Sequence, residues 1–186
     1  MGNIKALAVC GSLRKESFNL KLLNVAKKLA MKAGAEVVTA GLKMLDLPIY
    51  NFDIEAAGMP ENVLKLGKMV KDCDVMIIAS PEYNYSVSGA LKNAIDWVSR
   101  MKPNQFSGKF AAIFGASTGP MGTVRGQNQL RQILSCVNVI VTPQPQVLVA
   151  MAETAFVADG SLKNKLYEKN LQELLDKTFD AARKTK

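Results

Sequence analysis

The stretch Val9-Cys10-Gly11-Ser12-Leu13-Arg14-Lys15-Glu16-Ser17-Phe18-Asn19 links an apolar run to an amphipathic helical pattern. The run Ile4 to Cys10 is short and apolar enough to form a buried strand, and leucines and alanines from Leu22 to Ala33 recur at helical spacing. A strand that turns into a helix aims several free main-chain N–H groups at one point, where the helix dipole favours an anion. The stretch therefore predicts a phosphate-binding turn, or an ordinary turn in which Ser17 is only the N-cap.

The side chains of this turn suit an anion as well. Ser12, Ser17 and Asn19 add hydrogen-bond donors, and Arg14 adds a positive charge. The pattern is neither G-x-G-x-x-G nor G-x-x-x-x-G-K-[ST], which excludes a classical dinucleotide fingerprint and a P-loop.

The composition predicts one domain over residues 1–186, because 186 residues with 48% hydrophobic and 22% charged residues can bury a substantial core. The formal net charge of +8 favours anionic partners. The basic residues are spread along helices and no DNA or RNA motif is present, so we expect small anions rather than nucleic acid.

The chain contains no histidine, which excludes Ser-His-Asp and Cys-His catalysis and the H-E-x-x-H zinc site. Cys10, Cys73 and Cys136 are isolated in or beside apolar runs, as expected of reduced core cysteines, and no metal site is predicted. Without a signal peptide or an apolar run of about 20 residues, the sequence predicts a cytoplasmic protein that does not enter a membrane.

Apolar runs alternate with helical patterns along the whole chain, which is typical of a doubly wound α/β fold. We expect a five-stranded parallel sheet in the order 2-1-3-4-5 with helices on both faces. The predicted strands are Ile4–Cys10, Glu36–Leu42, Val75–Ser80, Phe110–Ala116, and one edge strand from Asn138–Thr142 and Gln146–Ala150 that Pro143 and Pro145 interrupt. A last helix is expected from Leu162 to about Arg183. The segment Asp46–Asp53 is predicted to be a loop, either a lid or an oligomer contact.

Three polar turns follow strands one, three and four, and ligands bind at this edge of such sheets. The first turn offers anion donors, the second (Pro81–Gly89) offers aromatic rings, and the third (Ser117–Thr123) is glycine-rich. FMN, with a phosphate at one end and a planar ring at the other, fits this outline. The simpler alternative is that Tyr83 and Tyr85 are surface aromatics and the glycines serve only the turn.

Three strings of sequence resemble the hallmark motifs of the NAD(P)H-dependent FMN reductase family: Gly11–Asn19, Ser80–Ser86 and Gly89–Trp97. Soluble members of this family include chromate, quinone and azo-dye reductases. The similarity extends over nearly the whole chain, including Arg125 and the segment Leu130–Leu134. It implies a flavodoxin-like fold that binds FMN and uses NADH or NADPH as co-substrate.

The resemblance also implies which residues bind FMN. Ser12, Arg14, Ser17 and Asn19 would hold the phosphate and ribityl chain, Pro81, Glu82, Tyr83 and Asn84 would line the isoalloxazine, and Ser117 would lie near its pyrimidine side. The complete implied set is Ser12, Leu13, Arg14, Ser17, Phe18, Asn19, Pro81, Glu82, Tyr83, Asn84 and Ser117.

No side chain is expected to be catalytic, because flavin N5 would relay hydride from the nicotinamide to the acceptor. Arg100 and Arg125 are candidates for binding the substrate, or are solvated surface residues. Family members form dimers or dimers of dimers, so a homo-oligomer, up to a homotetramer, is implied. Its candidate interface is the helix with Trp97 and the loop with Tyr50 and Phe52, unless Trp97 is a core residue.

The predicted function is an NAD(P)H oxidoreductase that reduces quinones, chromate, azo or nitro compounds. An open flavin face accepts all of these, so the resemblance implies a class of acceptors rather than one compound. The alternative is a flavodoxin-type electron carrier that binds FMN without oxidising NAD(P)H, although such carriers are expected to be acidic. A flavin-free nucleic-acid-binding domain is a third interpretation, based on the positive charge alone.

Overall fold

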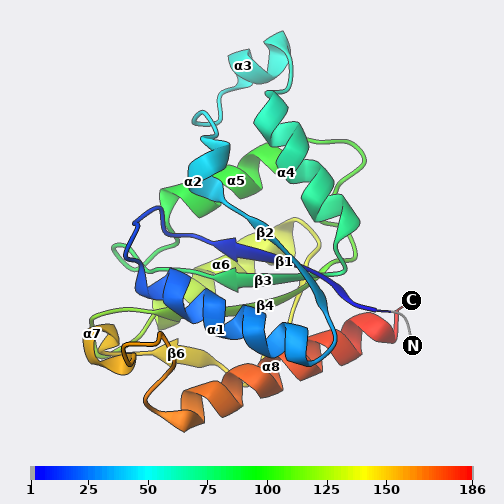
Figure 1. Cartoon of the computed structure of the whole chain (residues 1–186). Helices are drawn as coiled ribbons and strands as arrows, with labels where there is room; N and C mark the ends of the chain where they lie inside the picture. The colour runs from blue at the N-terminus through cyan, green and yellow to red at the C-terminus, as the bar shows by residue number, and fades with distance from the viewer. Residues whose placement is uncertain (1–2, 186) are drawn as a thin grey trace.

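Figure 1 shows the computed structural model of the protein, which describes residues 3–185. Strands and helices alternate as the sequence pattern predicts. The strands are β1 (Lys5–Cys10), β2 (Glu36–Ala40), β3 (Val75–Ala79), β4 (Phe110–Ala116), β5 (Ile140–Val141) and β6 (Val147–Val149). The helices are α1 (Phe18–Lys32), α2 (Leu42–Leu45), α3 (Phe52–Ala57), α4 (Glu61–Asp72), α5 (Gly89–Ser99), α6 (Val124–Cys136), α7 (Ala152–Ala155) and α8 (Lys165–Arg183).

Within residues 3–185 the strands form one parallel sheet in the order β2-β1-β3-β4-β5, which confirms the predicted order. The predicted edge strand is divided, and both halves pair with β4. Phe110 and Ala111 of β4 face β5, whereas its residues 114–116 face β6. The chain therefore returns to the carboxyl half of β4 after its proline-rich interruption.

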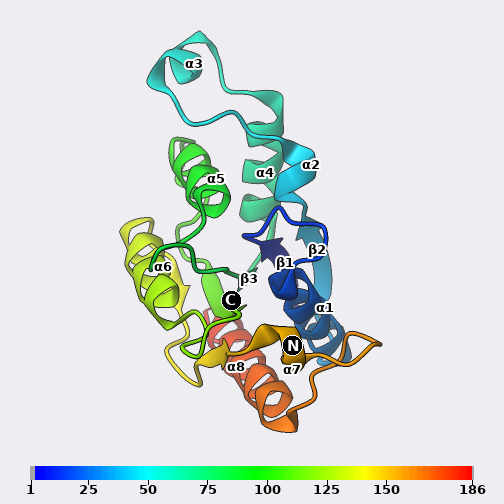
Figure 2. The same ribbon diagram turned by 90° about the vertical axis from the view of Figure 1, so that its left-hand side faces the viewer.

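Helices cover both faces of the sheet. In Figure 2, α1 and α8 lie on one side of the sheet, and α4, α5 and α6 lie on the other. Each face has its own apolar cluster. All residues of β3 and β4 are buried, as an unbroken apolar run predicts for strands covered on both faces. The start of β1 and the end of α8 lie on the same side of the molecule, opposite the carboxyl ends of the strands (Figure 1).

Several predicted boundaries were wrong, and two of them have a clear local reason. The second strand ends at Ala40 rather than Leu42, because Gly41 is the N-cap of α2. The last helix begins at Lys165 rather than Leu162, since the Asn164 side chain accepts a hydrogen bond from the N–H of Leu166 and caps the helix there. Leu166 is consequently 58% exposed and does not belong to the apolar stripe of α8.

Trp97 is a core residue, which is the alternative that the sequence left open for it. Its side chain is fully buried, and its Nε1–H donates to the carbonyl of Pro48 at 2.7 Å. Tyr50 packs edge-on against it, and the N–H of Tyr50 donates to Asn93 Oδ1 of α5 at 2.8 Å. Segment 46–53 is thus anchored to α5, although Ile49 remains 84% exposed. Its last residues form the start of α3, which the sequence pattern did not predict.

No helix within residues 3–185 combines the length and the apolar character that crossing a membrane requires.

Candidate functional site

The turns after β1, β3 and β4 meet at the carboxyl edge of the sheet, which faces the viewer in Figure 2. They enclose a cleft of about 120 Å³, which we name the turn cleft. It is lined by Ser12, Arg14, Ser17, Phe18, Asn19, Pro81, Glu82, Tyr83, Ala116, Ser117 and Thr118. Leu13 and Asn84 of the predicted set lie outside this lining, while Ala116 and Thr118 were not predicted. Thr118 lies in the third turn, which was predicted to reach this edge, and Ala116 directly precedes that turn, but neither residue was named for itself.

The first turn presents hydrogen-bond donors to the cleft. Ser17 caps α1, its Oγ accepting from the N–H of Leu20 at 3.3 Å, so the predicted N-cap is confirmed. The N–H groups of Phe18 and Asn19, in the first turn of the helix, lie outside the helical hydrogen-bond ladder. Arg14 is exposed and forms no ion pair with any residue in 3–185. This turn can therefore neutralise an anion with both charge and directed N–H groups.

Asn19 connects the first turn to β4. Its Nδ2 donates to the carbonyl of Ala116 at 2.8 Å, and its Oδ1 accepts from the N–H of Ala116 at 2.9 Å. Sequence analysis placed Asn19 among the ligands of the phosphate and ribityl chain. In the structure both polar atoms of its side chain bind main-chain groups of the protein.

The second turn is a tight hairpin. The main chains of Tyr83 and Ser86 exchange two hydrogen bonds of 3.0 Å. Between them, Asn84 and Tyr85 have φ angles of 51° and 66°, the pair of left-handed conformations that a type I′ turn requires. This conformation is costly for a bulky residue such as tyrosine, and such strain concentrates at functional sites. The hairpin holds the Tyr83 and Tyr85 rings at the exposed rim of the cleft.

The start of α6 supports this hairpin. Glu82 Oε2 accepts a hydrogen bond from the N–H of Gly126 at 2.8 Å, and so caps the free N-terminus of the helix, which has no side-chain cap of its own. Ser86 Oγ donates to Gln129 Oε1 at 2.5 Å. The guanidinium of Arg125 lies 4.2 Å from the centre of the Tyr85 ring. Of the two predicted substrate-binding arginines, Arg125 is thus at the rim of the site.

Arg100 lies elsewhere. It follows the last residue of α5, about 16 Å along the helix from the second turn. Its Nε donates to Glu55 of α3 at 2.9 Å, and its guanidinium lies over the Tyr50 ring. The hydrogen bond from Arg100, and a second one from the Tyr50 hydroxyl, lower the pKa of Glu55. Arg100 therefore holds α3 and the loop before it, and the structure does not bring it to the cleft.

Ser88 joins the first and second turns, and sequence analysis did not single it out. Its Oγ donates to the carbonyl of Gly11 at 2.5 Å and also caps α5 by accepting from the N–H of Leu91. A Cβ at Gly11 would lie 3.0 Å from the Pro81 ring, so the two turns pack too closely for a side chain. The signal in the sequence was a serine directly before an apolar helical pattern.

The third turn is held by the chain that follows β6. The N–H of Ser117 donates to the carbonyl of Val149, and the carbonyl of Ser117 accepts from the N–H of Ala152, both at 3.0 Å. Gly115, just before this turn, lies against Thr123 and the carbonyl of Ser80, with no space for a Cβ. Ser117 and Thr118 are therefore fixed relative to the sheet.

Cys10 lies beneath the first turn, at the end of β1. Burial raises the pKa of its thiol, and hydrogen bonds from the main chain of Ser12 and the side chain of Ser17 oppose that rise in part. A raised pKa keeps the thiol protonated at neutral pH, which does not suit a nucleophile.

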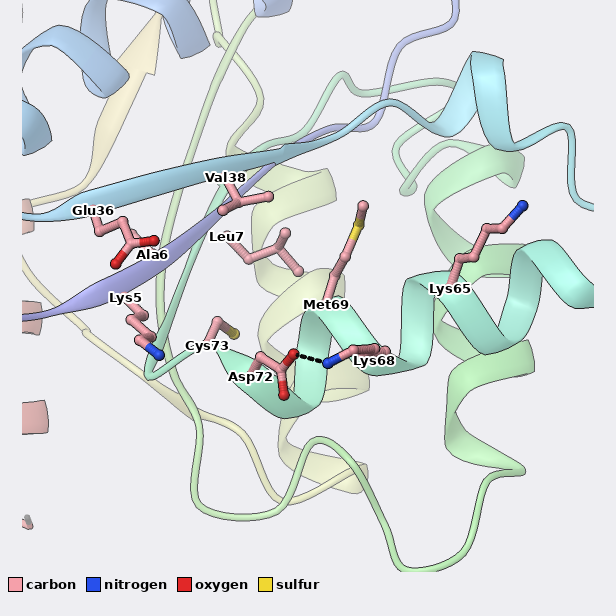
Figure 3. A pocket seen from close by; sticks show the side chains of 10 residues that line it. All are labelled: Lys5, Ala6, Leu7, Glu36, Val38, Lys65, Lys68, Met69, Asp72 and Cys73. Carbon is pink, nitrogen blue, oxygen red and sulfur yellow. Dashed lines mark hydrogen bonds and ion pairs between the residues drawn. The ribbon is translucent and has the colours of Figure 1, made fainter.

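Larger hollows lie outside the turn cleft, and two of them flank α2 and α4. The first, of about 760 Å³, borders the first turn at Leu13; we name it the α2 groove, lined by Leu13, Leu42, Lys43, Asp46, Leu47, Ile49, Gly89, Ala90 and Asn93. The second, of about 430 Å³, lies between β1, β2 and α4 (Figure 3). Leu7, Val38 and Met69 form its apolar wall, and Lys68 pairs with Asp72 at its rim. Because its strand residues Lys5 to Leu7 come from the amino half of β1, it does not adjoin the three turns.

The turn cleft fits the phosphate end of FMN. It offers the Arg14 cation, serine hydroxyls and the N–H groups at the start of α1. Sites that enclose a whole small ligand measure about 300–1,000 Å³. At about 120 Å³ the cleft encloses only part of a mononucleotide, and the remainder would lie along the open rim. Among residues 3–185, no three His, Cys, Asp or Glu side chains gather as a metal site would require.

Comparison with known proteins identifies the group to which the sequence and fold are similar. Residues 4–154 match the family model described as NADPH-dependent FMN reductase. An NAD(P)H-dependent FMN reductase of Pseudomonas aeruginosa is 40% identical over 173 residues, covering 93% of this chain and 92% of that protein. A quinone reductase of Escherichia coli K12 is 38% identical over 146 residues, 78% of this chain and 77% of that protein.

A solved structure shares both the fold and the sequence pattern. The flavoenzyme FerB of Paracoccus denitrificans, an NAD(P)H:acceptor oxidoreductase, superposes with a TM-score of 0.87 at 36% identity. The match covers 97% of this chain and 98% of that one.

Proposed function

Since the chain belongs to the NADPH-dependent FMN reductase family and is an FMN-dependent NAD(P)H oxidoreductase, we propose that its turn cleft holds FMN and that quinones are among its acceptors. The observation that carries this proposal is the convergence of three segments distant in sequence, near Ser12, Tyr83 and Ser117, on one cleft with donors for a phosphate. When FMN is bound, hydride transfer from NAD(P)H to the acceptor is chemistry that the cofactor supplies.

The first turn binds the phosphate. The Arg14 guanidinium adds a charge-assisted hydrogen bond, which is stronger than a neutral one. The hydroxyl of Ser12 and the free N–H groups of Phe18 and Asn19 would supply further donors to the phosphate, and the α1 dipole would favour its negative charge. Ser17 keeps this turn of α1 in place by capping it.

The second and third turns position the flat ring. Pro81 and the left-handed hairpin fix the main chain beside Glu82 and Tyr83, while Ser117 faces them from the end of β4. Because each turn is tied to a neighbouring element, the cleft is preorganised, and little ordering entropy is lost when a ring binds. Tyr83 and Tyr85 are exposed in the second turn, and a nicotinamide or a quinone would bind on this side of the cleft.

The direct test is a turnover assay with the purified protein saturated with FMN. Oxidation of NADH and NADPH is followed with and without a benzoquinone, against a blank that contains free FMN alone. The proposal predicts quinone-dependent oxidation well above the blank. Oxidation no faster than the blank would contradict it, and FMN binding without any NAD(P)H oxidation would instead indicate an electron carrier.

Anionic acceptors such as chromate, together with azo and nitro compounds, belong to the same proposal. Arg125 is the cation at the rim of the cleft that would attract an anionic acceptor or the dinucleotide phosphates. Replacing Arg125 by Gln should raise the KM for such a substrate several-fold with little change for a neutral quinone. An equal change for both would show that the charge is not used in binding.

We also propose that the protein forms a homo-oligomer. Leu13 and Ile49 line the α2 groove and are exposed, and Met44 of α2 and Phe52 of α3 are exposed as well. Soluble monomers rarely expose large apolar side chains together. We expect a second copy of the chain to cover this face, and Ile49→Glu to shift the mass measured by light scattering toward the monomer. An unchanged mass would exclude this face. The free thiols of Cys10, Cys73 and Cys136 suit the reducing conditions of the cytoplasm, where we expect the protein to act. Cys136 is exposed, so the prediction that it is a core cysteine was wrong.

A further inference from the structure

Asn19 and Ala116 are 97 residues apart in sequence and exchange two hydrogen bonds. The Nδ2 of Asn19 donates to the carbonyl of Ala116 at 2.8 Å, and the N–H of Ala116 donates to Asn19 Oδ1 at 2.9 Å. Asn19 lies in the first turn of α1, whereas Ala116 is the last residue of β4. Ala116 pairs with Val149 of β6 on one side, whereas the pairing of β4 with β3 ends at Phe114. The Asn19 side chain thus takes the place of a strand partner on the β3 side of Ala116.

Little of this side chain is available to a ligand. Asn19 is only 4% exposed, and both of its polar atoms face the main chain of Ala116. Arg14 in the same cleft differs in both respects, because its guanidinium is exposed and makes no ion pair in residues 3–185. Asn19 and Arg14 belong to the same sequence motif, but the side chain of Asn19 is buried and hydrogen-bonded whereas that of Arg14 is exposed.

We propose that Asn19 is a positioning residue, whose side chain locks the phosphate-binding first turn to the third turn without itself contacting the phosphate. This inference rests on the proposed binding of FMN in the turn cleft. Ala116 leads directly into Ser117, whose main chain is fixed on its other side by Val149 and Ala152. The Asn19 amide therefore sets the separation between the donors at the start of α1 and the residues that follow β4.

Only a side chain with both a donor and an acceptor can make this pair of bonds. Alanine at position 19 leaves the N–H and carbonyl of Ala116 without partners in a buried place, where an unmade hydrogen bond is costly. The N–H of residue 19 belongs to the main chain and is kept in Asn19→Ala. The variant therefore removes the lock, adds no charge and leaves the phosphate donors present.

The experiment compares the binding of FMN with that of riboflavin, which lacks the phosphate. Dissociation constants are measured by quenching of flavin fluorescence for the wild type, Asn19→Ala and Arg14→Gln. A residue that contacts the phosphate contributes to the binding of FMN but not to that of riboflavin. Arg14→Gln should therefore weaken FMN binding and leave riboflavin binding unchanged. Loss of the lock should weaken both flavins by a similar factor in Asn19→Ala, on the order of tenfold. A selective loss of FMN, or no loss of either flavin, would overturn the proposal.

Hydrogen exchange of the cofactor-free protein provides a readout that does not depend on flavin. Asn19→Ala should speed exchange of the Ala116 amide relative to the wild type, while Arg14→Gln should leave that rate unchanged. Unchanged exchange in Asn19→Ala would refute the lock. If the wild type bound no FMN, the proposed function would fail, and the exchange result would still decide the role of Asn19 in holding the two turns.

Discussion

The carboxylate of Glu82 accepts a hydrogen bond from the main-chain N–H of Gly126 at 2.8 Å, and this contact attaches the second turn to the N-terminus of α6. Gly126 suits this position because a Cβ there would lie 3.1 Å from the carbonyl of Ser86. One carboxylate oxygen of this acidic cleft residue is therefore bound to the N-terminus of a helix.

Removing this carboxylate should loosen the second turn. We expect Glu82→Ala to weaken FMN binding about tenfold, because a hydrogen bond to a charged group and the helix-dipole interaction are both lost. Glu82→Gln keeps an oxygen acceptor and should have a smaller effect. Fluorescence titration with FMN measures both variants, and Glu153→Gln, on exposed α7, is the matched control. Wild-type affinity in a folded Glu82→Ala protein would contradict the expectation.

Gly115 should tolerate no side chain. A Cβ there would overlap Thr123 and the carbonyl of Ser80, neither of which can move without shifting β3 or the third turn. Gly115→Ala should lower the free energy of unfolding by at least about 2 kcal/mol in urea titrations. Gly89→Ala is the control, since a Cβ at Gly89 has no atom within 4 Å and should be neutral or slightly stabilising. Equal stabilities of the two variants would show that the third turn can adjust.

The Arg100–Glu55 pair should make stability depend on pH in the acid range. Its hydrogen bond, together with that from Tyr50, lowers the pKa of Glu55 in the folded state. Stability from a lowered carboxyl pKa is present above the unfolded value, about 4.3, and is lost as the pH falls through the folded value. Glu55→Gln should therefore be less stable than the wild type at pH 7, with the difference shrinking below about pH 4. Urea midpoints at pH 7, 5 and 3.5 test this, and a constant difference would contradict it.

The cysteines should differ in reactivity. Cys73 lines the hollow beside α4 (Figure 3), but burial raises the pKa of its thiol to about 12, whereas Cys136 is exposed. At pH 8 iodoacetamide should modify Cys136 readily and Cys73 at least about 1,000-fold more slowly, because the thiolate is the nucleophile. Peptide mass mapping measures both, and labelling in urea controls for peptide detection. Rapid labelling of Cys73 in the folded protein would contradict this expectation.

The architecture could be predicted from the sequence because buried strands have a distinct apolar pattern. Strands covered on both faces must be apolar along their whole length, so β3 and β4 are visible as unbroken runs, and Pro143 and Pro145 mark the division of the edge strand. The ends of helices were harder to predict from the sequence. Leu162 was predicted to begin the last helix, but it is buried and pairs with Phe156 in an isolated bridge before α8 begins.

The roles of individual site residues were harder to predict than their location. The motif placed Asn19 at the first turn, but its partner Ala116 is defined only once β1, β3 and β4 are side by side. Trp97 shows the same limit, since an amphipathic helix pattern does not reveal that the Pro48 carbonyl will accept from its indole. The residue types of one segment can be read directly from the sequence, whereas a contact between two distant segments is known only once the fold is known.

The placement of the first strand's start and the last helix's end on the side away from the turns has a practical consequence (Figure 1). A linker joined to the end of α8 would emerge opposite the cleft. Protein immobilised on an electrode or a bead through that linker would present its three turns to the solution in a common orientation.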